Sequence, residues 1–321
     1  MSKPPLSVLL LGASGTIGQA VLSELVLQGH AVTCLIRKGA MDRDAGTFRK
    51  IEIDFSDDKG VERAFASVQA DAVISCMTSR SGIPSDAWAV DYLAHSRALK
   101  AALVAGIDRF VLLSAICVQK PSLEFQRAKL AFEAELRRSD ICWSIVRPTA
   151  FFKSLSGQVR RVQEGKPFLL FGDGTLTACC PISDRDLARY IVDCLTLQER
   201  WRQILPIGGP GPALTPRAQG ALLFELLNKP ARFRHVPIGV MDAIISTLST
   251  LGRISPALAT KAELAKIGRY YATESMLVWN ETAGRYDESA TPAFGSDTLR
   301  AHYEAMLRGD AQVDLGAHSV F

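Results

Sequence analysis

The stretch SVLLLGASGTIGQAVLSELVL, residues 7–27, predicts a strand, a glycine turn and a helix in immediate succession. The apolar run at 7–11 is typical of a strand buried on both faces, and apolar residues recur at helical spacing in 19–27. Three glycines separate the two elements, and they let the chain turn sharply and let a pyrophosphate approach the helix N-terminus. Glycines can also serve only as turns, but the stretch favours a dinucleotide site formed by Gly12, Ser14, Gly15, Thr16, Ile17 and Gly18.

A second apolar run at 31–36 ends in two cations, Arg37 and Lys38. In a dinucleotide-binding fold the end of this strand faces the adenosine ribose, where an acid selects a free 2′-hydroxyl and a cation accommodates a 2′-phosphate. A solvated basic loop is the alternative interpretation. The cationic end favours NADPH over NADH.

Strands and helices alternate along the first half of the chain. Further strands are predicted at 49–55, 71–76, 109–114 and 142–146, with helices at 57–68, 88–105 and 123–138. This alternation predicts right-handed crossovers and therefore an α/β fold with a doubly wound, parallel Rossmann sheet. Ligands of such sheets bind at the carboxyl ends of the strands. Besides the glycine turn, the cofactor-binding residues predicted there are Arg37, Asp54, Cys76, Ser114 and Pro148.

The regular alternation loosens after Pro148. Residues 1–150 are predicted to form an NADP-binding core, completed by about 181–208 with a helix at 184–195 and a last strand at 203–207. Residues 151–180 and 209–321 are expected to form a smaller, helix-rich, substrate-binding region, with a helix at 151–165, a short strand at 168–172 and a helix opened by Thr215 and Pro216.

Residues 238–251 carry apolar side chains at helical spacing, with serine and threonine on the other face. The segment is too short to span a bilayer, which needs about twenty residues. A packed helix, a lid over an apolar ligand and a shallow membrane contact are three interpretations of this segment.

Composition excludes several classes of function. The net charge of +4 is mild and spread along the chain, so nucleic acid is not an expected partner. The seven cysteines include no CxxC pair and the five histidines show no paired spacing, so we expect reduced thiols and no metal site. Only six residues precede the first strand, too few for a targeting segment, and a cytoplasmic protein is expected.

Short-chain dehydrogenases carry Tyr-x-x-x-Lys on the helix after the fifth strand, which puts a phenol and an ammonium on one helix face. Lys129 stands at the position of that lysine, but Phe125 replaces the tyrosine. Phe125 has no proton to give, so ordinary carbonyl reduction is disfavoured. Lys129 is the candidate catalytic residue, with a solvated surface lysine as the alternative.

Beyond the glycine turn and the lone lysine, several long stretches resemble one family. They are EFQRAKLAFEAEL at 124–136, SIVRPTAFFKSLSGQV at 144–159, FGDGTLTACCPIS at 171–183, LPIGGPGPALTP at 205–216 and KIGRYYATESM at 266–276. They are similar to the NADPH-dependent divinyl chlorophyllide a 8-vinyl-reductases, atypical short-chain reductases related to isoflavone reductases and NmrA-like regulators. The stretch that precedes the first strand is too short for the transit segment of plant members, so a bacterial protein is expected, and Cys180 stands where the resemblance implies a basic residue.

The resemblance implies that a tetrapyrrole is the substrate and that hydride from NADPH adds to its vinyl group. No alkoxide forms in that reaction, which is consistent with phenylalanine at position 125. Lys129 would hold the nicotinamide ribose and provide positive potential, and the proton would come from water or from an unidentified side chain. Phe125, Phe151 and Phe152 would offer flat surfaces to the pigment, although a plain core role is equally compatible. An NADP-sensing regulator without catalysis and a reductase of another conjugated alkene are the two alternatives. The pigment reductase is expected to be soluble or peripherally associated with the photosynthetic membrane.

Overall fold

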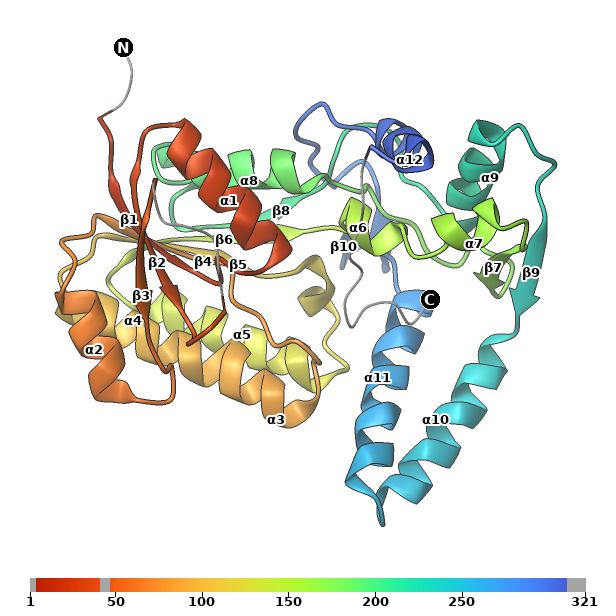
Figure 1. Ribbon diagram of the computed structural model, residues 1–321. Coiled ribbons are helices and arrows are strands. Elements are labelled where there is room, and N and C mark those ends of the chain that lie inside the picture. Colours follow the sequence, from red (N-terminus) through yellow and green to blue (C-terminus); the bar gives the residue numbers. More distant parts are fainter. Residues whose placement is uncertain (1–3, 41–46, 311–321) are drawn as a thin grey trace.

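The computed structural model describes residues 4–40 and 47–310 (Figure 1). Its centre is a seven-stranded sheet in the order β3-β2-β1-β4-β5-β6-β8, in which all neighbouring strands are parallel. The strands are β1 (Ser7–Leu11), β2 (Ala31–Ile36), β3 (Arg49–Glu52), β4 (Ala72–Ser75), β5 (Arg109–Leu113), β6 (Cys142–Pro148) and β8 (Gln203–Ile207). The predicted doubly wound parallel sheet is therefore confirmed.

Helices cover both faces of this sheet (Figure 1). One face carries α1 (Thr16–Leu27) and α8 (Asp184–Asp193), which pack against each other. The other carries α2 (Asp58–Ala66), α4 (His95–Val104) and α5 (Glu124–Arg138). Shorter helical turns lie between the main elements: α3 (Pro84–Ala87), the π-helix η1 (Trp88–Ala94), and the 3₁₀ helices η2 (Ile116–Gln119) and η3 (Gln198–Arg200).

The interior strand β1 is buried on both faces, as its sequence predicts. Val8 and Leu10 belong to the core shared with α1 and α8, whereas Leu9 and Leu11 belong to the core on the opposite face. All four side chains are inaccessible to solvent. The alternation follows from the two-residue period of a strand, which sends successive side chains to opposite faces.

Two predicted helices differ from the observed ones. The helix predicted at 88–105 begins earlier, at Pro84, and passes through η1 before α4. The helix predicted at 151–165 is divided into α6 (Phe152–Leu155) and α7 (Val159–Gln163). Its break has a local cause, because the Ser156 hydroxyl donates to the carbonyl of Phe152 and the Ser156 N–H turns back to Lys153.

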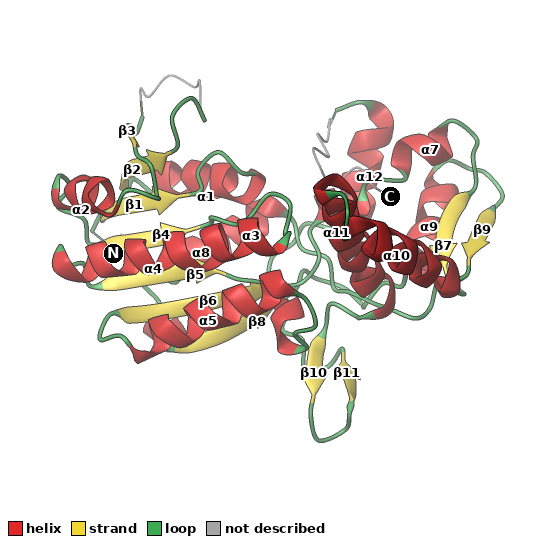
Figure 2. Ribbon diagram, turned by 90° about the horizontal axis from the view of Figure 1, so that it is seen from below, coloured by secondary structure: helices red, strands yellow, loops and turns green. Residues whose placement is uncertain are grey.

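The remainder of the chain builds a second, smaller cluster. The parallel strands β7 (Phe168–Phe171) and β9 (Phe233–Val236) pack with α7, α9 (Pro216–Leu226) and α12 (Leu299–Arg308) around Tyr303. Thr215 caps α9 as expected, since its hydroxyl accepts from the N–H of Ala218 at 3.2 Å. The antiparallel hairpin of β10 (Val278–Asn280) and β11 (Arg285–Asp287) was not predicted, and it projects from the molecule in Figure 2.

Helices α10 (Ile238–Gly252) and α11 (Pro256–Thr273) form a hairpin that projects beyond the sheet (Figure 1). All residues of α10 are described, and Met241 is its only buried side chain. The helix instead exposes Val240, Ile244 and Leu251, so it is not a fully packed helix. Within 4–40 and 47–310, no helix combines the length and the apolar character needed to cross a bilayer.

Candidate functional site

The glycine turn between β1 and α1 packs tightly on its inner side and is open on its outer side. Gly12 has a φ of +78°, and a Cβ added there would lie 2.6 Å from the carbonyl carbon of Cys76. A Cβ at Gly18 would lie 2.0 Å from the carbonyl oxygen of Gly12. Gly15 is exposed at the start of α1, and its nearest such contact is 3.5 Å. The turn therefore needs glycine at two positions for packing and presents its third to solvent, where a phosphate can approach.

The predicted cofactor-binding residues gather at one edge of the sheet. The strands are parallel, so residues that end them meet at the same edge. Gly12, Ser14, Gly15, Thr16, Ile17 and Gly18 form the turn after β1, and Arg37, Asp54, Cys76, Ser114 and Pro148 lie at the ends of β2, β3, β4, β5 and β6. Cys76, Ser114 and Pro148 are buried, whereas Arg37 and Asp54 are exposed.

A cation that the sequence analysis did not single out also reaches the glycine turn. The ammonium of Lys153, on α6, donates to Thr16 Oγ1 at 2.9 Å. Thr16 opens α1, and a helix N-terminus carries partial positive charge that repels another cation. A lysine held at this place is consistent with an anion bound between them, and the diphosphate of a dinucleotide meets that requirement.

Lys129 is buried in an ion pair. Its Nζ donates to Asp91 Oδ1 at 2.8 Å and to Thr78 Oγ1 at 3.3 Å. Asp91 comes from the π-helix η1, and its carboxylate also accepts from the backbone N–H of Ser79. Burial acts to raise the pKa of Asp91, but the Lys129 charge and these hydrogen bonds outweigh it and lower the pKa. The Asp91 carboxylate is therefore charged at neutral pH, and the surface-lysine interpretation of Lys129 is wrong because the side chain is buried.

A buried histidine lies behind this ion pair. The Nδ1 of His95 is 2.9 Å from the carbonyl oxygen of Val90, which only accepts, so Nδ1 carries the proton. Its Nε2 is then free to accept from the Ser75 hydroxyl at 2.8 Å. Burial is the main reason that the pKa of His95 falls to about 4, while the Asp91 charge opposes this shift and the Lys129 charge adds to it. His95 is therefore neutral at physiological pH and supports η1 without adding charge.

Ser114 belongs to a second polar cluster, together with Glu133 of α5 and Arg147 of β6. Its hydroxyl donates to Glu133 Oε1 at 2.6 Å, and Arg147 forms a two-point ion pair with the same carboxylate. Glu133 is buried, so the arginine compensates a charge that would otherwise be strongly destabilising. The Ser114 proton is thereby committed to Glu133, and its oxygen remains able to accept from a ligand.

The three predicted substrate-binding phenylalanines do not form one surface. Phe125 belongs to a cluster with Ile116 and Tyr270, Phe151 packs against the core beside α8, and Phe152 belongs to the cluster around β7. Phe125 and Phe152 are buried, and Phe151 is half-buried. The structure therefore distributes these rings among three hydrophobic clusters.

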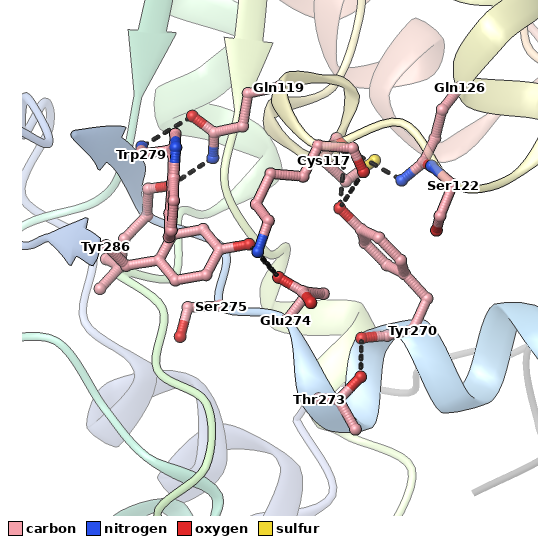
Figure 3. A network of polar contacts seen from close by, with 12 residues as sticks. Cys117, Gln119, Ser122, Gln126, Tyr270, Thr273, Glu274, Ser275, Trp279 and Tyr286 are labelled. Carbon is pink, nitrogen blue, oxygen red and sulfur yellow. Dashed lines mark hydrogen bonds and ion pairs between the residues drawn. The ribbon is translucent and has the colours of Figure 1, made fainter. Parts of the chain in front are cut away.

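The loop after β5 is tied to the C-terminal segment by polar contacts (Figure 3). Tyr270, on α11, donates to the carbonyl oxygen of Cys117 at 2.9 Å, and Gln126 donates to the same oxygen. Lys120 forms an ion pair with Glu274 at 2.9 Å and lies over the ring of Trp279. The C-terminal segment consequently lies against the same sheet edge as the predicted cofactor residues.

Among the described residues, no group of three or more His, Cys, Asp or Glu side chains is arranged to hold a metal ion.

Asp91, Glu133 and Lys153 were missed by the sequence analysis, because each depends on a partner from another element. A weak signal existed for Lys153, which lies within one of the family-like stretches. The turn, the open face at Gly15 and the cations at Arg37 and Lys153 together fit a nicotinamide dinucleotide.

Comparison with known proteins agrees with this geometry. A family model described as NAD(P)H-binding matches residues 12–198. The solved NADPH-dependent quinone oxidoreductase of Escherichia coli, complexed with NADPH, superimposes with a TM-score of 0.65 over 94% of this chain and 99% of that one. Its sequence identity is 15%, so this likeness concerns the fold alone.

Two plant proteins match almost the whole chain. The chloroplastic divinyl chlorophyllide a 8-vinyl-reductase of Oryza sativa subsp. indica is 47% identical, with 98% of this chain and 82% of that protein covered. The protein of the same name from Arabidopsis thaliana is 45% identical, with 98% and 80% covered. Identity at this level over 98% of the chain makes it a member of the divinyl chlorophyllide a 8-vinyl-reductase family.

Proposed function

We propose that the protein reduces the 8-vinyl group of divinyl chlorophyllide or protochlorophyllide to an ethyl group, with NADPH as the reductant. The observation that carries this proposal is the near-complete match to reductases of that name. The reaction belongs to chlorophyll or bacteriochlorophyll biosynthesis. When bound, NADPH supplies a hydride, and all other requirements fall on the chain itself.

Residues 1–150, completed by about 181–208, are proposed to bind the cofactor. The N-terminus of α1 and the Lys153 ammonium hold the diphosphate, and Arg37 contacts the 2′-phosphate. Cys76, Ser114 and Pro148 line the edge beside the nicotinamide, and Asp54 closes the adenosine side. The preference for NADPH over NADH rests on Arg37.

Lys129 is proposed to position the nicotinamide ribose. An ammonium has three N–H donors, and two of them go to Asp91 and Thr78. The third is proposed to reach a ribose hydroxyl. Because Asp91 neutralises most of the lysine charge at a distance, Lys129 acts here through a directed hydrogen bond more than through long-range positive potential.

Residues 151–180 and 209–321 are proposed to bind the pigment. A tetrapyrrole is large, flat and apolar, and the exposed face of α10 offers Val240, Ile244 and Leu251 beyond the sheet edge. Phe151 is the predicted phenylalanine with surface to offer, whereas Phe125 and Phe152 support the wall from within. We propose that the protein acts in the cytoplasm and that this α10 face covers the bound pigment. The same face can also rest on the surface of the photosynthetic membrane.

The test is direct conversion. Purified protein given NADPH and divinyl chlorophyllide should consume both and shift the Soret band to shorter wavelength, because loss of a vinyl group shortens the conjugated system. Mass spectrometry should show the gain of two hydrogens. Tight NADPH binding without turnover of either pigment would instead support an NADP-sensing regulator, and turnover of a different alkene would support the other alternative.

A further inference from the structure

Reduction of a vinyl group needs a proton as well as a hydride, and α5 provides no phenol because Phe125 occupies that position. The chain has six tyrosines, all within the described residues. Three of them donate their hydroxyls to strong acceptors, namely backbone carbonyls or a carboxylate: Tyr270, Tyr286 and Tyr303. Of two others, Tyr92 has its hydroxyl bonded to the Glu135 carboxylate, and Tyr190 lies on α8, which covers the sheet face opposite α5. Tyr271 remains.

The Tyr271 side chain differs from its neighbour in both exposure and partner. Tyr271 is 44% exposed, whereas Tyr270 is 6% exposed. Its hydroxyl lies 3.8 Å from the Sγ of Cys117, and sulfur is a weak acceptor that leaves the proton available. Burial is the main reason that the pKa of Tyr271 rises well above its usual value, and the contact with Cys117 adds to the rise. Tyr271 therefore combines a partly accessible side chain with a protonated hydroxyl whose partner is a weak acceptor.

Cys117, the partner of the Tyr271 hydroxyl, lies in the loop that joins β5 to α5. Burial raises the pKa of the Cys117 thiol, while the Tyr271 hydroxyl and the Lys129 charge both act to lower it. The phenol on α11 and the ammonium on α5 therefore act on the pKa of the same thiol. Cys117 itself follows β5, the strand that ends at Ser114.

The helix face that carries Tyr271 meets α5 at the position of the missing phenol. Ile267 lies one turn earlier on α11, and residues four apart share one face of a helix. A Cβ added at Gly82 would lie 2.9 Å from Ile267 Cδ1 and 3.8 Å from Phe125 Cδ1, so these two side chains flank the same glycine. The face of α11 that includes Tyr271 consequently lies beside Phe125.

We propose that Tyr271 is the catalytic residue that donates the proton completing the ethyl group, so that α11 supplies the phenol that α5 lacks. The proposal rests on the proposed function. Hydride, with both electrons of its broken C–H bond, forms a bond to one vinyl carbon, and NADPH is oxidised to NADP⁺. The Tyr271 O–H bond breaks, its proton joins the other vinyl carbon, and the phenolate regains a proton from water after the product leaves.

The test compares Tyr271→Phe with Tyr270→Phe, a matched loss of one hydroxyl from the adjacent residue. A positioned general acid contributes roughly 100-fold or more to a rate, so kcat should fall by that factor in Tyr271→Phe. Pigment affinity without NADPH, measured by fluorescence quenching, and NADPH affinity should each stay within about threefold of the parent, since the ring remains. Tyr270→Phe should lower the melting temperature and keep kcat within about threefold.

Each outcome decides the matter. If the parent reduces the pigment and Tyr271→Phe keeps the parental kcat, the proposal on Tyr271 is refuted while the proposed function stands. A Tyr271→Phe variant that loses pigment affinity and retains kcat at saturation also refutes it, because the hydroxyl then only binds. A folded parent that binds the pigment and NADPH without any turnover refutes both.

Discussion

Lys129 and Arg37 are both cations at the predicted cofactor edge, but their surroundings differ completely. Lys129 is buried and ion-paired with Asp91, which comes from a helix 38 residues earlier. Arg37 is exposed at the end of β2. An exposed cation at a strand end can be interpreted from position alone, since the fold dictates what that end faces. A buried cation is defined by partners that only the folded chain brings together.

The largest expected effect comes from breaking the buried pair. In Lys129→Met the Asp91 carboxylate loses its counter-ion in a buried site, which typically destabilises a protein by about 3–5 kcal/mol. We therefore expect a large fall in the unfolding free energy measured by urea titration, together with loss of pigment reduction.

A second substitution separates stability from function. In Lys129→Met/Asp91→Asn the buried charge is gone, so most of the lost stability should return, whereas activity should stay low because no ammonium reaches the ribose. A single Lys129→Met variant as stable as the parent would mean that Asp91 is protonated or hydrated in the native state. Recovery of activity in the double variant would mean that Lys129 serves only the fold.

Arg37 is the exposed half of the comparison, and its effect should be smaller and confined to one cofactor. A hydrogen bond to a charged group is worth about 1.5–3 kcal/mol, so Arg37→Ala should weaken NADPH roughly ten- to a hundredfold. NADH has no 2′-phosphate and should bind as before, and the unfolding free energy should not change. Titration of both cofactors against parent and variant measures this. Equal losses for the two would show that Arg37 does not read the phosphate.

The same distinction explains how much could be predicted from sequence. The parallel sheet and the turn at Gly12 follow from local patterns, because strand burial and glycine spacing can be recognised in consecutive residues, whereas the strand order depends on contacts between distant segments. The π-helix that carries Asp91 was missed, since nothing in WAVDYLA departs from ordinary helical spacing. Tyr271 was also missed, because its relation to Cys117 spans 154 residues. The folded chain brings these residues to their partners, and local sequence patterns do not predict such contacts.

The smallest expected effect concerns His95, which supports the buried half of the comparison. Its pKa is lowered from 6.5 to about 4, chiefly by burial, so the unfolded chain takes up a proton that the folded chain refuses. Stability should therefore fall as the pH drops below about 6.5 and continue to fall until the pH nears 4, where the folded protein is protonated as well. Between about pH 8 and about pH 5.5 this single group should lower the unfolding free energy by about 1.4 kcal/mol.

His95→Gln isolates that contribution, because an amide can still bond to Ser75 and cannot titrate. Urea unfolding of both proteins at the two pH values gives the difference directly, and contributions from His30 and His302, whose pKa values are also lowered by burial, cancel in it. The parent should lose about 1.4 kcal/mol more than the variant over this range. Equal losses would mean that His95 is protonated in the folded protein, and the buried side of the comparison would then carry two cations beside Asp91, with Lys129 no longer its sole counter-ion among the described residues.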